Sequence, residues 1–386
     1  MMETGYYKFT NLEHLYYGPD SLQKIPKILK DWGCQKSAII STKSLIEKTD
    51  LVKKLEKITE ATHTQTLGSI AQHSPIKQIK ELVEQIEVLG LDSIIAIGGG
   101  SPIDGTKFVN HLYHEKTGKY LKYIAVPTTL SAAEYTTGAG YTNEEGVKEQ
   151  KKDPAMCPGA IILDPNVTTS TPERLWVSTG MRAIDHAIES LYRPGVPVFN
   201  KRLCYAALED LFRYLPLSKA NPGNLEYRNA LQVASAMSIF PLQMEGGNMT
   251  PWPLSHVLGH QLGATYEIPH GITTCITLSR VVRMKANSPH VSPEEKEWVA
   301  GALPYIRRGM GVHDVFADEI VVERQVEEVA DRIQKLVDGL GLHSNLKDWK
   351  VGREEVGKIV ERVTKEEKGR TERGEIERVL EECYDA

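Results

Sequence analysis

Three histidines lie close together in the sequence, at His256, His260 and His270. His256 and His260 are four residues apart, so on a helix they share one face. His270 follows in a Pro-His-Gly turn, and His186 lies in a separate helical segment. Neutral imidazoles are common ligands for divalent metals, and an imidazole near a substrate can relay protons. A single histidine pair is often only a packing or capping feature, but the third histidine in a turn favours a functional cluster.

A glycine-rich turn is the second feature that could do chemistry. A buried apolar run at residues 93–97 leads into Gly98-Gly99-Gly100, and we expect a helix with Ser101 as N-cap and Pro102 as its first residue. Glycines allow a close backbone approach and a helix N-terminus offers free N–H groups, so the turn suits a pyrophosphate. The turn matches neither G-x-G-x-x-G nor a P-loop. A turn without a ligand is the alternative.

Short β-rich runs alternate with helical patterns over about the first 165 residues. Strands are predicted at residues 37–41, 93–97, 124–126 and 161–163, with helical spacing at residues 45–55 and 76–86. This alternation is typical of parallel βαβ units. It predicts an α/β domain built on a parallel, doubly wound sheet.

Helical periodicity dominates the rest of the chain, over residues 173–193, 201–215, 227–243 and 254–262. The charged tail from residue 352 keeps its apolar positions on helical faces, which indicates a pair of amphipathic helices. We therefore expect an α/β domain over residues 1–170 and an all-helical domain over residues 171–386, joined near residues 164–172.

The composition narrows the class of protein. The chain has 386 residues and a formal charge of −5, with 41% hydrophobic and 25% charged residues, which are ordinary values for a globular protein. The acidic balance excludes a nucleic-acid binder that works by bulk positive charge. No apolar run reaches the roughly 18 residues of a membrane span, and no signal peptide is visible. The five cysteines are scattered and read as reduced thiols. These features predict a soluble, cytoplasmic protein, with a homodimer as the common default.

Four motifs in order carry a resemblance to a known family. They are Gly98-Gly-Gly-Ser-Pro-Ile-Asp104, Pro127-Thr-Thr129, Gly180-Met-x-Ala-x-x-His186-Ala-Ile-Glu189 and His256-x3-His260-x9-His270-Gly271. Together they resemble the iron-containing (group III) alcohol dehydrogenases over roughly residues 10–280. The stretch from Pro127 through Glu134 is more similar to the shorter loop of maleylacetate reductases.

The resemblance implies a fold and a chemistry. It implies a dinucleotide-binding α/β domain and a helical catalytic domain in the architecture of dehydroquinate synthase, with the active site in the cleft between the domains. It also implies hydride transfer with NAD(H) or NADP(H).

Site residues follow from the resemblance position by position. The pyrophosphate would be held by Gly98, Gly99, Gly100 and Ser101, with Asp104 nearby, and Thr128 and Thr129 would line the adenine and nicotinamide side. The family holds its metal, iron or zinc, with an Asp and three His, which here would be His186, His256 and His270. His260 matches a histidine close to the nicotinamide and the substrate.

The sequence departs from the family at the metal-binding Asp, whose position is occupied by Arg182. Arg182 and His186 are four residues apart, so the guanidinium faces the metal site and its fixed charge repels a cation. Asp185 is not expected to substitute, because a residue adjacent to His186 projects about 100° away around the helix. An ordinary surface arginine, paired with Asp185 or Glu189, is the alternative reading.

Two outcomes are open at this position. Three histidines and a water make a workable zinc site if Arg182 swings aside. Otherwise no metal binds, and Arg182 polarises a carbonyl or clamps a substrate carboxylate. Maleylacetate reductases resemble the second case, and we favour it.

A second departure concerns the cofactor. Thr42 stands where many family members carry an Asp that hydrogen-bonds the ribose 2′-OH and repels a 2′-phosphate. With Lys43 adjacent, the absence of that acid permits NADPH, which we place slightly ahead of NADH.

The leading hypothesis is an NAD(P)H-dependent oxidoreductase that reduces a carbonyl or conjugated C=C bond in a small, anionic substrate. Arg182, His186 and His256 would bind the substrate, and His260 or His270 would deliver the proton. The alternatives are a metal-dependent alcohol dehydrogenase, a dehydroquinate-synthase-like lyase and a silent NAD(P)-binding protein. Residues 194–200 and 235–252 are candidates to line the pocket, with these side chains considered: Met237, Phe240, Met244, Asn248 and Trp252.

Overall fold

The computed structural model divides the chain into two compact units. It describes residues 8–68, 70, 74–145, 148–240, 242–243, 252–312, 321–367 and 371–385. The first unit holds residues 1–171, 223–236 and 241–245, and the second holds residues 172–222, 237–240 and 246–386. The first division therefore falls at residues 171–172. Residues 223–236, expected in the helical domain, group with the first unit instead.

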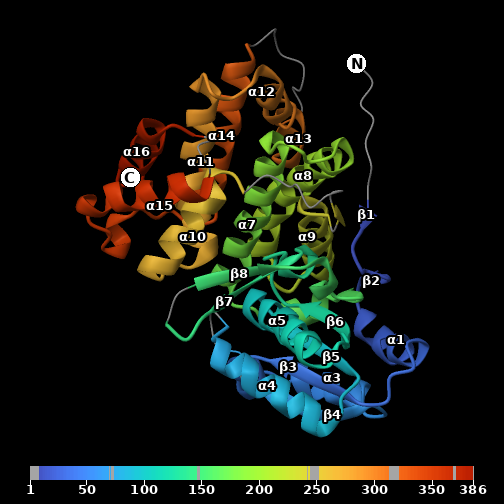
Figure 1. Cartoon of the computed structure of the whole chain (residues 1–386). Coiled ribbons are helices and arrows are strands. Elements are labelled where there is room, and N and C mark those ends of the chain that lie inside the picture. Colours follow the sequence, from blue (N-terminus) through green and yellow to red (C-terminus); the bar gives the residue numbers. More distant parts are fainter. Residues whose placement is uncertain are drawn as a thin grey trace. The chain divides into compact units, whose positions relative to one another are not determined.

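The first unit contains the α/β part of the chain (Figure 1). Its strands are β1 (Lys8–Phe9), β2 (His14–Tyr17), β3 (Ser37–Ser41), β4 (His63–Gly68), β5 (Ser93–Gly98), β6 (Lys122–Pro127), β7 (Gly138–Thr142), β8 (Lys148–Lys152), β9 (Ala160–Leu163) and β10 (Leu242–Gln243). Its helices are α1 (Ile25–Asp31), α2 (Lys43–Lys48), α3 (Leu51–Ile58), α4 (Ile76–Leu89), α5 (Gly100–Thr117) and α6 (Pro165–Thr168), together with most of α9 (Leu225–Ser238).

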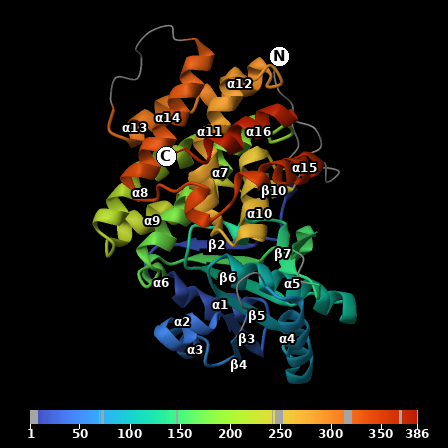
Figure 2. The same cartoon turned by 90° about the vertical axis from the view of Figure 1, so that its left-hand side faces the viewer.

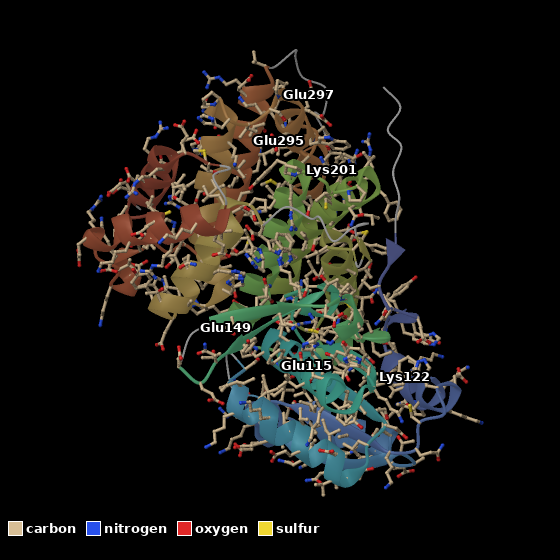
Figure 3. The ribbon with its side chains drawn as sticks, viewed as in Figure 1. Glu115, Lys122, Glu149, Lys201, Glu295 and Glu297 are labelled. Atoms are coloured by element: carbon tan, nitrogen blue, oxygen red, sulfur yellow. The ribbon has the colours of Figure 1, made fainter. Side chains whose placement is uncertain are left out.

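Six strands form one parallel sheet in the order β2-β9-β6-β5-β3-β4. Helices cover both of its faces, with α1 and α3 on one side and α4 and α5 on the other (Figure 2). Lys122, labelled in Figure 3, is the first residue of β6, and its Nζ lies 3.1 Å from Oε1 of Glu13, the residue before β2. The chain runs from β3 outward to β4 and then returns past β3 to β5, so the winding reverses between β3 and β5. The predicted doubly wound parallel sheet is confirmed.

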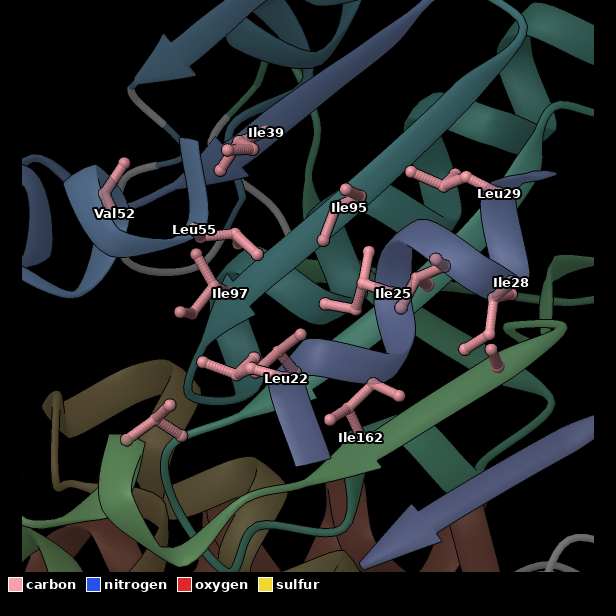
Figure 4. Packing of buried hydrophobic residues seen from close by; sticks show 14 of the residues in the cluster. Leu22, Ile25, Ile28, Leu29, Ile39, Val52, Leu55, Ile95, Ile97 and Ile162 are labelled. Carbon is pink, nitrogen blue, oxygen red and sulfur yellow. The ribbon is translucent and has the colours of Figure 1, made fainter. Parts of the chain in front are cut away.

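The central strands are apolar because both faces of the sheet are covered. Every residue of β3 and β5 is buried. Alternate side chains of β5, Ile95 and Ile97, pack in a core cluster with Ile25 of α1 and Leu55 of α3 (Figure 4). Burying such branched side chains is the main free-energy gain of a sheet of this kind.

Several elements differ from the sequence-based expectation. The helix after the glycine turn begins at Gly100 with Gly99 as N-cap, two residues before the expected start, and Ser101 makes no capping hydrogen bond. The helical pattern at residues 45–55 is two helices, α2 and α3. The strands β2 and β4 and the β7–β8 hairpin were not predicted, since they are short or carry polar residues.

The described part of the second unit is helical. Its helices are α7 (Glu173–Tyr192), α8 (Val198–Ala220), α10 (Leu254–Tyr266), α11 (His270–Asn287), α12 (Pro293–Ala300), α13 (Leu303–Gly309), α14 (Val322–Gly339), α15 (Val356–Glu367) and α16 (Arg373–Glu382). The last two are the amphipathic pair predicted for the charged tail. Among the described residues, none of the helices combines the length and the apolar character of a membrane span.

The loop after β6 carries a buried carboxyl group at Glu134. Its side chain is 2% exposed, and its Oε2 atom has no hydrogen-bond partner among the described residues. Burial raises the pKa of Glu134 to about 7, although the nearby Lys107 ammonium lowers it. The folded chain therefore holds a proton that the unfolded chain releases at lower pH.

This difference predicts a pH-dependent stability. In the unfolded chain Glu134 loses its proton near its ordinary pKa of 4.5, and in the folded chain near 7. Raising the pH between these values therefore favours unfolding, and the penalty is constant above them. Because Glu134→Gln cannot ionise, we expect calorimetry to show the variant gaining about 1–3 kcal/mol over wild type at pH 8 relative to pH 5. An equal stability difference at both pH values would contradict the assignment.

Candidate active site

The glycine turn that was expected to bind a phosphate lies in the first unit, at the point where the winding of its sheet reverses. Ligands of open α/β sheets bind at such a point, beyond the carboxyl ends of the strands. Gly98 ends β5 with φ +147°, which an L side chain rarely adopts, and a Cβ there would lie 2.6 Å from Cγ of Pro102. A Cβ on Gly99 would meet Cγ2 of Thr129 at 3.2 Å. The missing side chains leave the backbone and the start of α5 open to an anion.

The other predicted cofactor residues surround this turn or follow β3. The backbone N–H of Thr128 donates to the carbonyl of Gly98 at 2.9 Å, and Thr129 hydrogen-bonds Ser131. Oδ1 of Asp104 lies 3.1 Å from the buried Nζ of Lys107, one turn along α5. Thr42 follows β3 and its hydroxyl caps α2. This backbone geometry fits the pyrophosphate of a dinucleotide.

In the second unit, α7 carries a stripe of buried polar side chains. Arg182, Asp185, His186 and Glu189 recur at helical spacing on one face, and none is more than 3% exposed. Nη1 of Arg182 lies 2.5 Å from Oδ2 of Asp185. Charged side chains are almost never buried in this way unless they are paired. This face of α7 is therefore a buried polar cluster whose charges are paired with one another.

The stripe meets His256, which lies in the first turn of α10. Nη2 of Arg182 is 2.5 Å from Nδ1 and 2.9 Å from Nε2 of the His256 ring. The ring centroid of His256 is 4.5 Å from that of His260, 5.7 Å from His186 and 5.8 Å from His270. The structure thus brings the other three predicted histidines around His256, which Arg182 contacts.

One aromatic side chain, Trp252, and one cationic side chain, Arg193, extend this cluster. The indole ring of Trp252 stacks on the His256 ring, with centroids 4.3 Å apart and planes 7° apart. Arg193 directly follows the last residue of α7, one turn beyond Glu189. Its guanidinium carbon lies 4.2 Å from the centroid of the Trp252 ring. Sequence reasoning had Trp252 only as a pocket candidate and missed Arg193. The i, i+4 spacing of Glu189 and Arg193 was the available signal.

One expectation about α7 is wrong, and the alternative reading of Arg182 holds only in part. Asp185 was expected to project away from the site, but its Oδ2 lies 3.8 Å from Nδ1 of His256. Asp185 lies three residues after Arg182, and residues three or four apart on a helix are neighbours. A helical face is wide enough to include both Asp185 and His186. Arg182 is paired with Asp185, as the alternative reading had it, but it is buried and not on the surface.

Electrostatics keep the central imidazoles neutral. Burial and the Arg182 guanidinium hold the pKa values of His256 and His186 well below their ordinary range. Burial raises the pKa values of Asp185 and Glu189, while Arg182 lowers both. Nδ1 of His186 is buried without a hydrogen-bond partner among the described residues. The cluster therefore combines a guanidinium and two carboxyl groups with imidazoles that are held neutral.

The residues present do not fit the metal site that the resemblance implies. That site needs a carboxylate at position 182, and here a guanidinium occupies the position and contacts the nitrogens that His256 would offer to an ion. A divalent cation bound by His256 would lie within a few ångströms of this fixed positive charge. Among the described residues, two groups have ligand atoms within 4.8 Å of one another, His256 with His260 and His270, and His256 with Asp185 and Glu189. Neither group includes His186, so neither is the ligand set that the resemblance implies.

The predicted pocket residues have mixed outcomes. Trp252 lies at the cluster. Phe240 packs edge-on against Phe199, with centroids 5.7 Å apart. Met244 and Asn248 lie outside the described residues, and Met237 lies near the end of α9.

Comparison with known families covers nearly the whole chain. Residues 13–165 match the model of the iron-containing alcohol dehydrogenases, and residues 176–379 match the model of the C-terminal domain of that family. These matches include both the glycine turn and the histidine cluster.

Relatives and solved structures agree with this assignment. A maleylacetate reductase of Pseudomonas sp. (strain P51) is 28% identical over 74% of this chain and 76% of its own. A 1-propanol dehydrogenase of Citrobacter freundii is 25% identical over 74% of this chain and 75% of its own. The alcohol dehydrogenase from Oenococcus oeni has the same fold, with a TM-score of 0.85 at 22% identity over 98% of this chain and 100% of its own. The chain therefore belongs to the iron-containing alcohol dehydrogenase family, and it is an NAD(P)-dependent oxidoreductase.

Proposed function

We propose that the protein reduces a carbonyl group, or a C=C bond conjugated with one, in a small anionic substrate without using a metal. The buried guanidinium of Arg182, 2.5 Å from a ring nitrogen of His256, is the observation that carries this proposal. Similarity to maleylacetate reductases supports it. Arg182 is held in the cluster by Asp185, whose Oδ2 lies 2.5 Å from Nη1.

Arg182 supplies the positive charge that a metal provides elsewhere. A guanidinium presents several N–H donors in a plane, so it binds a carboxylate in bidentate fashion or stabilises the oxygen on which charge develops. Its burial strengthens either interaction, because little water screens it. His186 and His256, held neutral beside it, add hydrogen-bonding groups without adding charge.

Proton delivery falls to His260 or His270. His256 is buried, whereas His260 is partly exposed and His270 is exposed, so these two can exchange protons with water. Their rings stack with centroids 5.2 Å apart. His260 also lies close to an acid, with its Nδ1 3.6 Å from Oε1 of Glu366. A carboxylate beside one ring nitrogen orients the imidazole and sets which nitrogen faces away from it.

The cofactor is NADPH or NADH, bound at the turn after β5, and when bound its reduced nicotinamide supplies the hydride. Glycines 98–100 and the start of α5 hold the pyrophosphate, with Ser101 and Asp104 beside it. Thr42 and Lys43 after β3 accept a 2′-phosphate, because position 42 carries no acid to repel it. This makes NADPH the favoured donor.

One observation favours a second candidate, a metal-dependent alcohol dehydrogenase. His256, His260 and His270 could hold an ion, and a 1-propanol dehydrogenase is among the relatives. This candidate requires Arg182 to leave His256, and the pair with Asp185 opposes that movement.

The role of Arg182 predicts a change in substrate preference. We expect Arg182→Ala to lower kcat/KM for an oxo-acid such as maleylacetate by about 10²–10³-fold, and for a neutral aldehyde such as butanal far less. Arg182→Lys should restore part of the loss, because it keeps the charge but not the planar fork. The exposed Arg213→Ala, on α8, is the control. The affinity for NADPH, measured by fluorescence titration, should be the same in all variants.

Equal losses for the acid and the aldehyde would rule out a carboxylate clamp. An unchanged rate for both would remove Arg182 from the reaction altogether. Because Arg182→Ala leaves Asp185 buried without its partner, thermal unfolding must show that the variant is folded under the assay conditions.

The open position after β3 predicts a change in cofactor preference. Thr42→Asp introduces the acid that selects against a 2′-phosphate, so Kd for NADPH should rise by about tenfold or more while Kd for NADH stays within a few-fold. Thr64→Asp, an exposed position on β4, adds the same charge as a control. A parallel change for both cofactors in Thr42→Asp would show that this residue does not face the ribose.

A further inference from the structure

The helix that carries His256 and His260 has no cap of its own. α10 begins at Leu254 after Pro253, and a proline side chain cannot accept a hydrogen bond. The first backbone N–H groups of a helix have no partner within the helix, so a buried start needs acceptors from elsewhere. Leu254, Ser255 and His256 are all buried, so water cannot serve as the acceptor for their N–H groups.

Glu189 of α7 supplies those acceptors. Its Oε1 accepts the backbone N–H of Ser255 at 2.7 Å, and its Oε2 accepts that of His256 at 3.2 Å. The hydroxyl of Tyr192 also donates to Oε1 at 2.9 Å. The carboxyl group is fully buried and lies at the N-terminus of α10, where a helix favours negative charge.

The same helix therefore holds His256 at two points. Glu189 and Arg182 are seven residues apart, two turns along one face of α7. Glu189 holds the backbone of His256, and Arg182 contacts its ring. A rigid helix thus sets the distance between the two contacts, and with it the position of the ring relative to the guanidinium.

We propose that Glu189 is a positioning residue that fixes the imidazole of His256 against Arg182 by capping α10. The inference rests on the proposed function, since it gives the Arg182–His256 pair a role in binding the substrate. Misplacing a group of this kind by about 1 Å can cost on the order of 10²-fold in rate.

The substitution Glu189→Gln tests the contact to His256 selectively. In its best orientation the amide oxygen still accepts from Ser255 and Tyr192, which share Oε1 in the wild type. The NH₂ group then faces the N–H of His256, so that donor loses its acceptor. Tyr192→Phe is the matched control, because it removes one buried hydrogen bond to Glu189 and leaves both backbone contacts in place.

Steady-state kinetics with an oxo-acid, thermal unfolding and the affinity for NADPH are measured on the full-length variants. We expect both variants to lose some thermal stability. Glu189→Gln should lower kcat/KM by about 10- to 100-fold with unchanged affinity for NADPH, whereas Tyr192→Phe should change kcat/KM by less than about 3-fold. Equal kcat/KM in the two variants would reduce Glu189 to a purely structural residue and overturn the proposal.

A second readout does not depend on activity. In protein labelled with ¹⁵N- and ¹³C-histidine, the ring and backbone-amide signals of His256 should move in Glu189→Gln and stay near their wild-type positions in Tyr192→Phe. Unmoved His256 signals in Glu189→Gln would overturn the positioning role. A wild-type chain that reduces no oxo-acid would instead contradict the proposed function, and the NMR comparison would still decide the role of Glu189.

Discussion

The contact between the Arg182 guanidinium and the His256 ring is the interaction on which the proposed chemistry depends. A fixed positive charge buried in a helical unit is costly unless it is paired, and here it lies 2.5 Å from Asp185 and 2.5 Å from His256. The same charge lowers the pKa of the neighbouring imidazoles and opposes a divalent cation at their nitrogens. In the proposed function, this one substitution in a family motif replaces a metal ligand with a group that binds anions.

The two units contribute different parts of this chemistry, and each follows from its own architecture. In the first, the winding of the parallel sheet reverses between β3 and β5, and the residues after those strands are the ones proposed to bind the cofactor. In the second, α7 presents its polar stripe to α10, whose start depends on Glu189. Because residues at a given spacing on a helix lie at fixed distances from one another, α7 sets the distance between Arg182 and Glu189.

Much of this could be predicted from sequence, and the failures have physical reasons. The buried strands of the sheet were found because they are continuous apolar runs, whereas β4 and the β7–β8 hairpin carry polar residues and gave no such signal. The histidines of α10 were found from their spacing. The inward direction of Asp185 was missed because a strict view of spacing ignores the width of a helical face. The hydrogen bonds from the backbone of Ser255 and His256 to Glu189 join residues far apart in sequence, so no local sequence pattern predicts them.

Metal content is the most direct test of the central claim. Wild-type protein and an Arg182→Asp variant, both produced with added zinc and iron and purified without chelator, would be compared by elemental analysis. If Arg182 replaces the metal, the wild type should contain far less than one ion per chain, and the variant, with the carboxylate restored, should approach one. A wild-type chain that holds close to one ion would contradict the account, because the histidines would then bind metal despite the arginine.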